Sequence, residues 1–151
     1  MAYQGFFTPR FPQKYQGDHT KIVYRSSWEA LVFKWLDDNP DVVNWSSEET
    51  VVPYRCATDG KMHRYFPDVK IVFKSGTIML VEIKPESQIR RPESKPGKKK
   101  TTYIMECFTF AKNSSKWDAA AEYCRKNGWV FSIWGETMLK NMGIVIIKGR
   151  K

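Results

Sequence analysis

Three charged residues lie in a stretch that otherwise predicts buried β-strands. The segment YFPDVKIVFKSGTIMLVEIK carries Asp68 near one end and Glu82 and Lys84 near the other. The runs 69–73 and 78–81 are rich in β-branched and aromatic residues, which is typical of strands in a buried sheet. Two carboxylates and an ammonium group are costly to bury, so a functional role is favoured over a purely structural ion cluster.

A tight hairpin between these two strands brings the three charges together. The loop is expected to hold three residues, 74–76, with Gly76 in the left-handed conformation. Asp68 then lies opposite Glu82, and Lys84 shares a face with Glu82 because strand side chains alternate. A two-residue loop would shift the register by one and turn Asp68 to the other face, so this prediction depends on the turn.

The expected pair of facing carboxylates calls for a cation, because two like charges repel unless one is protonated or a cation lies between them. Mg²⁺, with Mn²⁺ as a substitute, prefers hard oxygen ligands and is commonly held by carboxylates together with substrate phosphate oxygens. The predicted ligands are Asp68, Glu82 and the backbone carbonyl of Ile83. Lys84 is then expected to face the attacking water and the scissile phosphate. These residues predict metal-dependent hydrolysis of a phosphodiester.

The charge of the chain favours a polyanionic partner. Lys and Arg number 25 against 16 Asp and Glu, which gives a formal net charge of +9 over 151 residues. Much of this excess lies in a predicted basic loop, 85–100, which begins directly after Lys84. A solvated loop is the alternative, but its position beside the charged cluster favours phosphate contacts. The loop residues predicted to bind DNA are Arg90, Arg91, Lys95, Lys98, Lys99 and Lys100.

Several classes of protein are excluded by composition. No run approaches the roughly 18 apolar residues of a membrane helix, and the N-terminus lacks the pattern of a signal peptide. The three cysteines form no CxxC pair, so neither a disulfide framework nor a zinc site is expected. With 42% hydrophobic residues, the chain is expected to be a soluble intracellular protein with one core.

The order of predicted elements indicates a single α/β domain. Residues 1–24 are expected to form an irregular basic and aromatic arm, followed by the domain at 25–151. A capping-box spacing and an apolar stripe predict a helix from Ser26 to Asn39, whereas 101–112 is ambiguous between helix and strand. The other expected elements are extended segments at 42–45 and 50–55, a turn at 57–61, strands at 64–73 and 77–84, a helix from Ser114 to Asn127, a strand at 129–134, a short helix at 136–141 and an apolar run at 144–147.

Longer segments of the chain resemble a known group of nucleases. Pro67-Asp68 followed by Glu82-Ile83-Lys84 matches the PD-(D/E)xK nuclease signature. The wider segments MAYQG, KYQGDHTKIVYRSSWE, WLDDNPDVVNW, HRYFPD, VEIKP and KWDAAAEYC resemble the head completion nucleases of large contractile-tailed bacteriophages. The core pattern is also similar to the endonuclease subunit of certain cut-and-paste transposons. The resemblance implies a restriction-endonuclease-like fold, in which helices flank a central mixed sheet, and metal-dependent DNA cleavage.

The resemblance also implies a role in assembly. The protein is expected to finish the DNA-filled head before head–tail joining, trimming or cutting DNA there, with head, portal or neck proteins as partners. Its expected location is the cytoplasm of the host bacterium, with association with the virion head left open. The alternative is a non-catalytic DNA-binding or neck-interaction protein on a nuclease-derived fold, which the intact acid–acid–lysine set disfavours. The aromatic N-terminal arm is the leading docking candidate, although most of its rings are expected to pack on the domain: Tyr3, Phe6, Phe7, Phe11 and Tyr15.

Further residues are expected to flank the site. In relatives of this fold an acid from the first helix often completes the metal site, and Glu29 matches it by position, although Glu29 is also the capping-box acid. Lys116 is expected in the first turn of its helix, either solvated or compensated by a bound phosphate. Arg25 and Arg64 are predicted to contact the DNA backbone. His63 is an optional general base, since a metal can itself generate hydroxide.

Overall fold

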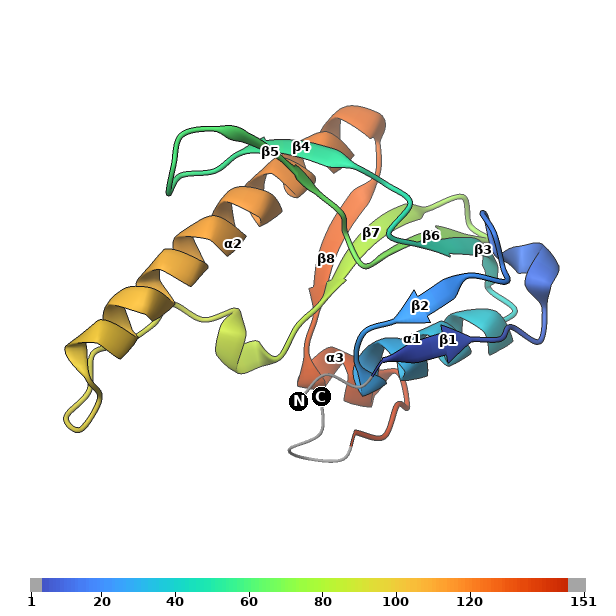
Figure 1. Cartoon of the computed structure of the whole chain (residues 1–151). Coiled ribbons are helices and arrows are strands. Elements are labelled where there is room, and N and C mark those ends of the chain that lie inside the picture. Colours follow the sequence, from blue (N-terminus) through green and yellow to red (C-terminus); the bar gives the residue numbers. More distant parts are fainter. Residues whose placement is uncertain (1–3, 147–151) are drawn as a thin grey trace.

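A four-stranded mixed sheet forms the centre of the protein (Figure 1). The computed structural model describes residues 4–146. The strand order is β3 (Val42–Ser47), β6 (Val69–Phe73), β7 (Ile78–Ile83) and β8 (Val130–Trp134). The pairs β3–β6 and β6–β7 are antiparallel, whereas β8 runs parallel to β7. The predicted α/β class with a central mixed sheet is confirmed.

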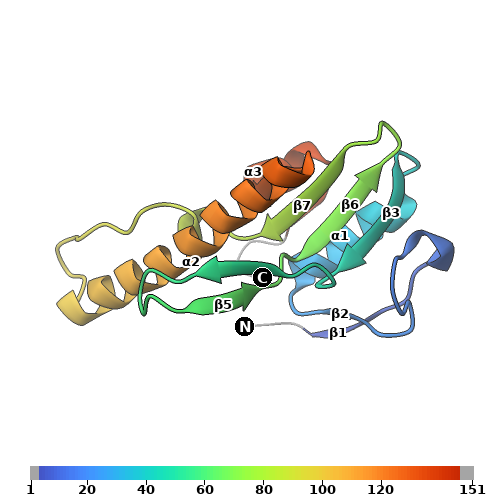
Figure 2. The same ribbon diagram turned by 90° about the horizontal axis from the view of Figure 1, so that it is seen from above.

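Helices cover both faces of this sheet (Figure 2). On one face lie α1 (Ser27–Asp38) and the short α3 (Glu136–Asn141), and on the other lies α2 (Lys100–Asn127). The side chains of β7 alternate between the two cores, so that Val81 packs with α1 while Leu80 packs with α2. Each face of the sheet therefore has its own apolar core, and both are completed by helices.

The N-terminal residues contain more regular structure than the predicted irregular arm. The strand β1 (Gly5–Phe7) pairs antiparallel with β2 (Ile22–Tyr24), and the 3₁₀ helix η1 (Pro12–Lys14) lies between them in the sequence. The ammonium group of Lys14 donates to the carbonyls of Leu36, Asp37 and Asn39, at distances of 2.9, 2.9 and 2.8 Å. These bonds satisfy carbonyls that the end of α1 leaves without helical partners, and they fix the segment to the domain.

Two of the four described rings singled out from the sequence, Phe7 and Tyr15, pack in the core, whereas Phe6 and Phe11 are exposed. Tyr15 is buried with its ring centroid 4.8 Å from that of Trp45, and Phe7 lies 5.9 Å from the same indole. Phe6 is 72% exposed and Phe11 is 38% exposed. Tyr3 lies outside the described residues. Phe6 is therefore the ring of this segment most available for a docking contact.

The single strand predicted over 64–73 is wrong, because the chain breaks there into two strands of different sheets. The strand β5 (Met62–Tyr65) pairs with β4 (Val52–Arg55), and β6 begins only at Val69 in the central sheet. Pro67 lies at the break and has no backbone N–H, so it cannot contribute a donor to a continuous ladder. The break directs the β4–β5 hairpin toward α2, where the Ala57 N–H donates to the Ser115 hydroxyl at 3.1 Å.

The ambiguous segment 101–112 is helical and continuous with the helix predicted from Ser114. The resulting α2 holds 28 residues and ends at Gly128, whose φ of 72° provides the predicted left-handed cap. Its first half extends away from the sheet (Figures 1 and 2), so three apolar residues there remain exposed: Ile104, Met105 and Phe108. Because this half of the helix packs on no core, its sequence has no clear apolar stripe. The expectation that Lys116 lies in a first helical turn is wrong, because it lies well inside α2.

The last described residues extend the α1 core. Ile144 and Ile146 pack against it without forming a helix or strand, and residue 147 of the predicted apolar run lies outside the described residues. Among the helices of residues 4–146, none is long and apolar enough to cross a membrane.

Candidate active site

The predicted hairpin register is confirmed. Gly76 has a φ of +92°, and the Phe73 N–H donates to the Thr77 carbonyl at 2.9 Å across the three-residue loop. Val69 pairs with Val81, so the next residues outward, Asp68 and Glu82, face each other at the end of the hairpin. Both follow the alternation that places Leu80 toward α2, and the site therefore lies on the α2 side of the sheet.

Asp68 takes over a hydrogen bond where the ladder ends. Its Oδ2 accepts the Ile83 N–H at 2.7 Å. In an antiparallel pair the N–H and C=O of one residue point to the same side, so the Ile83 carbonyl also points toward the Asp68 end of β6. Continuing the register places Pro67 opposite Ile83, and proline has no N–H to give that carbonyl. The Pro-Asp pair thus fixes one carboxylate and leaves the Ile83 carbonyl without a ladder donor.

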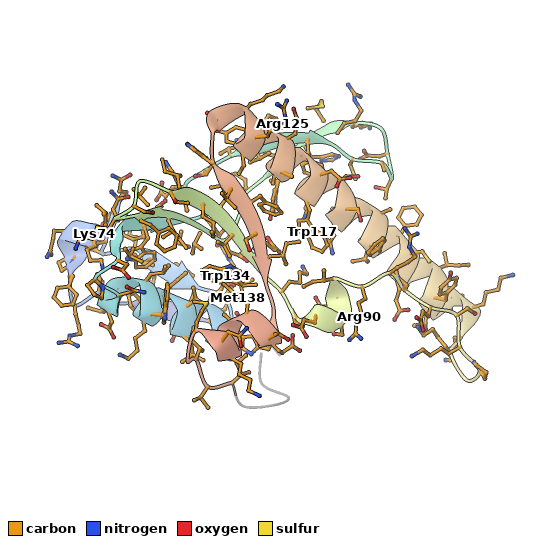
Figure 3. The ribbon with its side chains drawn as sticks, turned by 180° about the vertical axis from the view of Figure 1, so that it is seen from behind. Lys74, Arg90, Trp117, Arg125, Trp134 and Met138 are labelled. Carbon is orange, nitrogen blue, oxygen red and sulfur yellow. The ribbon has the colours of Figure 1, made fainter. Side chains whose placement is uncertain are left out.

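Glu82 is held between a phenol and an ammonium group. The Tyr65 hydroxyl donates to Glu82 Oε1 at 2.5 Å, and Lys84 Nζ lies 3.7 Å from Glu82 Oε2. Tyr65 is buried, and desolvation together with the negative charge of Glu82 raises the pKa of its hydroxyl, so it remains a donor. Trp117 is a buried residue of α2 that lies toward the sheet (Figure 3), and its indole partly opposes this rise in the pKa of Tyr65. The predicted proximity of Glu82 and Lys84 is therefore observed.

Three other carboxylates lie near enough to Asp68 to act on its charge. Burial raises the pKa of its carboxyl well above the usual range, and the charges of Glu82, Glu29 and Glu48 add to this effect in that order. The hydrogen bond from Ile83 acts in the opposite direction but does not offset them. The ionised form of Asp68 is thus disfavoured in the protein as it stands, and a cation at this position would relieve the repulsion.

Glu29 serves the helix cap and also acts on the site. Ser26 is the N-cap of α1, and its hydroxyl accepts the Glu29 N–H at 3.2 Å, as the capping-box spacing predicts. The Glu29 carboxylate accepts the Arg25 N–H at 3.3 Å. Glu29 is nevertheless buried, and its charge reaches Asp68. The structural and the functional interpretation of Glu29 are compatible, and its role as a metal ligand stays a prediction.

Glu48 was not identified from the sequence. It follows β3 with a φ of 54°, an uncommon left-handed conformation for a non-glycine residue. Its N–H donates to the Asp68 carbonyl at 3.2 Å, and its Oε2 lies 2.9 Å from the Arg25 guanidinium. Arg25 is thus committed to an ion pair at the edge of the site, although 57% of its side chain stays exposed. The sequence SSEET gives no periodic signal that this acid returns to Asp68.

The remaining flanking candidates differ in how close they come to the site. Lys116 Nζ lies 5.8 Å from the Tyr65 ring; burial and then the neighbouring Lys112 lower its pKa, whereas Glu82 raises it. Arg64 is exposed and stacks at 5.7 Å over the Phe66 ring. His63 Nε2 lies 2.8 Å from the carboxylate of Asp59, in the β4–β5 hairpin. Lys116 therefore joins the site, whereas His63 pairs within its own hairpin.

The predicted basic loop lies beside α2. After the 3₁₀ helix η2 (Glu86–Gln88), it forms one wall of a groove of about 780 Å³ that begins at Lys84. Four predicted DNA-binding residues line this groove: Arg90, Arg91, Lys95 and Lys98. Lys99 and Lys100 are exposed at the start of α2 and do not line it.

The donor set fits a hard divalent cation such as Mg²⁺. Within residues 4–146, no three His, Cys, Asp or Glu side chains are arranged as a ready-made metal site. Asp68 and Glu82 offer two carboxylates, and Ile83 offers a carbonyl that the ladder leaves without a donor. Two carboxylates with further oxygens from water and substrate phosphate form the kind of site Mg²⁺ uses. A cation here would also relieve the repulsion from Glu82 that contributes to the raised pKa of Asp68.

Asp68→Asn protein is expected to be more stable than the wild type in EDTA at neutral pH. A carboxyl whose pKa is raised by folding stabilises the folded state at low pH, and this contribution is lost as the pH rises through the folded pKa. Asparagine keeps an acceptor for the Ile83 N–H and has no charge. Thermal melts should show a gap of a few degrees that closes toward acidic pH, since about 1 kcal/mol corresponds to roughly 3 °C at this size.

The same melts with Mg²⁺ provide the control for this prediction. Mg²⁺ should raise the melting temperature of the wild type and leave that of Asp68→Asn unchanged, because a ligand stabilises only the state that binds it. A wild type that is the more stable protein in EDTA at neutral pH would contradict the electrostatic description of Asp68.

Comparisons with known proteins point to nucleases. The chain matches the family described as TnsA-like endonuclease N terminal over residues 39–136, a span that includes Asp68, Glu82 and Lys84. It is also 40% identical over 147 residues to a protein named head completion nuclease of Enterobacteria phage T4. That alignment covers 95% of this chain and 97% of the phage T4 protein. No solved structure is significantly similar to the chain.

Proposed function

Since the chain belongs to the TnsA-like endonuclease family, we propose that it hydrolyses DNA phosphodiesters at the site formed by Asp68, Glu82 and Lys84. One observation supports this more than any other. The hairpin register sets two carboxylates opposite each other, with an ammonium group 3.7 Å from one of them and a pKa at Asp68 that is raised by burial and then by repulsion from Glu82. Such a charge cluster is costly as a structural device and suited to holding a metal and a phosphate.

Asp68, Glu82 and the Ile83 carbonyl would hold the divalent ion. When bound, Mg²⁺ or Mn²⁺ would polarise the phosphate and lower the pKa of an attacking water. The Ile83 N–H fixes Asp68, and Tyr65 fixes Glu82, so both carboxylates are oriented before substrate arrives. Preorganised ligands need no rearrangement during the reaction, which is the main source of electrostatic catalysis.

Lys84 is placed to act on the reacting phosphate. It leaves β7 on the same face as Glu82, its backbone N–H donates to the Trp134 carbonyl at 3.0 Å, and its side chain is 24% exposed. The ammonium group therefore stands at the mouth of the site with its backbone fixed. There it would orient the nucleophilic water and stabilise the negative charge that builds on the phosphate in the transition state. Lys116, near Tyr65, adds positive potential on the α2 side.

The biological role follows from the phage relative. The phage T4 protein is named a head completion nuclease, and its alignment with this chain is nearly full-length. We therefore assign this chain to head completion before tail joining, where it would trim or cut DNA at the filled head. Cleavage of other DNA would be limited because binding through distributed positive charge is salt-sensitive. The enzyme would then act mainly where a head, portal or neck protein concentrates it on DNA. Phe6 is the exposed ring of the N-terminal segment that could contribute to docking.

A plasmid-nicking assay tests the proposed activity. Supercoiled DNA incubated with the protein should be nicked or linearised in Mg²⁺ or Mn²⁺ and remain intact in EDTA. Cleavage that persists in EDTA would contradict the metal requirement. Binding without cleavage under every metal condition would support the alternative of a non-catalytic assembly protein.

A further inference from the structure

The two walls of the groove beside the site are connected by hydrogen bonds. Lys98 joins its two walls, because its ammonium group donates to the Glu106 carboxylate on α2 at 2.8 Å and to the Glu93 carbonyl in the loop at 2.7 Å. The Lys98 ammonium group therefore helps to hold the loop against α2, and its predicted contact with DNA stays a prediction. The loop thus runs beside the first half of α2 (Figure 2), which extends beyond the sheet.

The lining of the groove suits a nucleic acid. Five cationic and two acidic side chains line it, and one of those acids, Glu106, is neutralised by Lys98. Among the described residues, the groove-lining cations of the loop that form no ion pair are Arg90, Arg91 and Lys95. All three follow Lys84 in the sequence. The α2 wall contributes hydroxyl and amide groups that can donate to phosphate or base edges: Thr101, Thr102, Thr109 and Asn113.

The groove also contains a stacking surface. The Arg91 guanidinium lies 5.5 Å from the centre of the Phe110 ring, and both line the groove with Met105. Aromatic rings and guanidinium planes are the surfaces on which unpaired bases stack in single-strand binding proteins. In a duplex the base faces are covered by neighbouring base pairs, so this feature is useful only to an unpaired strand.

The volume of the groove suits a short stretch of a single strand. Its volume of about 780 Å³ falls within the roughly 300–1,000 Å³ of pockets that enclose drug-sized ligands, which is room for a few nucleotides of one strand. The charge, the stacking surface and the volume of the groove thus all favour a single strand as its ligand.

We propose that this groove binds one unpaired DNA strand and leads it to Lys84, so that the preferred substrate carries a single-stranded end or flap. This inference rests on the proposed nuclease function for its reaction but not for its binding step. The strand would place its phosphates along Arg90 and Lys95 and a base on Arg91 and Phe110. The phosphate that reaches Lys84 is then the one beside Asp68 and Glu82.

Binding in EDTA tests the proposal without any cleavage. The variant replaces Arg90, Arg91 and Lys95 by alanine, and fluorescence anisotropy measures its affinity for a labelled single strand and for a blunt duplex of equal length. Single-strand affinity should fall by roughly tenfold or more, with the salt slope smaller by about 1.4, since each of the two lost phosphate contacts, at Arg90 and Lys95, removes about 0.7. Duplex affinity should fall much less.

A matched control carries the same loss of charge elsewhere. Lys74, Lys126 and Lys140 are exposed, lie outside the groove, and can be replaced together by alanine. Lys74 lies on the opposite side of the molecule from Arg90 (Figure 3). The control should leave single-strand affinity within about twofold of the wild type, since none of its charges contacts the strand. Circular dichroism should show both triple variants folded.

The outcomes separate this inference from the proposed function. If the groove variant and the control weaken single-strand binding equally, or if duplex binding falls as much as single-strand binding, the groove is not the path of a single strand. In Mg²⁺, the wild type should cut a duplex with a single-stranded extension faster than a blunt one, and the groove variant should lose that preference. Failure of all cleavage with intact groove binding would instead contradict the proposed function alone.

Discussion

Asp68→Asn and Glu82→Gln proteins are each expected to cleave DNA at least about 1,000-fold more slowly than the wild type, because a metal site supplies several kcal/mol of transition-state stabilisation. Asparagine and glutamine keep the shape of the side chains and an acceptor for the bonds from Ile83 and Tyr65, so the fold should be unchanged. DNA binding should be at least as tight as in the wild type, since a negative charge is removed and distributed cations carry the affinity. Single-turnover cleavage and anisotropy in the same buffer measure the two effects.

Asp118→Asn is the matched control for this pair. Asp118 is exposed on α2, so its substitution removes the same charge without touching the site. Its cleavage rate should stay within about twofold of the wild type, as expected for a surface change. Lys84→Ala should also lose cleavage and retain binding, because only one of many cations is removed. Metal-dependent cleavage by Asp68→Asn or Glu82→Gln at the wild-type rate would show that the site lies elsewhere.

A phage that lacks this gene should not be rescued by Asp68→Asn protein. Head completion is proposed to need cleavage, so infected cells supplied with this variant should accumulate separate heads and tails, with the yield of infectious phage reduced by about 1,000-fold as cleavage is. Supply of the wild type or of Asp118→Asn should restore the yield. Plaque counts and electron microscopy of the lysates measure the result. A normal yield with catalytically dead protein would leave head completion to a structural role and the nuclease site without a part in it.

The centre of the site was predictable because it depends on local signals. Gly76 at the end of a three-residue loop fixes the hairpin register, and the register alone brings Asp68 to Glu82. Alternation then places Lys84 on the same face. The helix cap at Ser26 was equally local, because its partner is only three residues away.

The rest of the site depends on tertiary contacts that the periodic pattern of apolar residues in the sequence does not predict. Tyr65 reaches Glu82 only because the chain breaks at Pro67 and β5 leaves the central sheet, whereas the sequence pattern predicted one continuous strand. Glu48 reaches Asp68 through a left-handed turn after β3, and nothing in its neighbourhood signals that conformation. Lys116 was placed at a helix start because the exposed first half of α2 has no apolar stripe.

The groove was predicted only as a basic loop. Charge composition indicated a phosphate contact, but the second wall comes from the part of α2 whose helical state was ambiguous. The contact by which Lys98 holds the loop was missed for the same reason, since its partner Glu106 lies on that helix. Composition thus predicted a polyanionic ligand, and the tertiary structure added the groove that we propose binds it.

The proposed mechanism needs a divalent ion between Asp68 and Glu82, beside Lys84. An anomalous difference map from a crystal of this protein grown with Mn²⁺ tests it directly. A peak is expected on the α2 side of the hairpin end, roughly 2 Å from oxygens of both carboxylates and of the Ile83 carbonyl. A well-ordered Mn²⁺ peak elsewhere in the protein, with Asp68 and Glu82 free of metal, would contradict it.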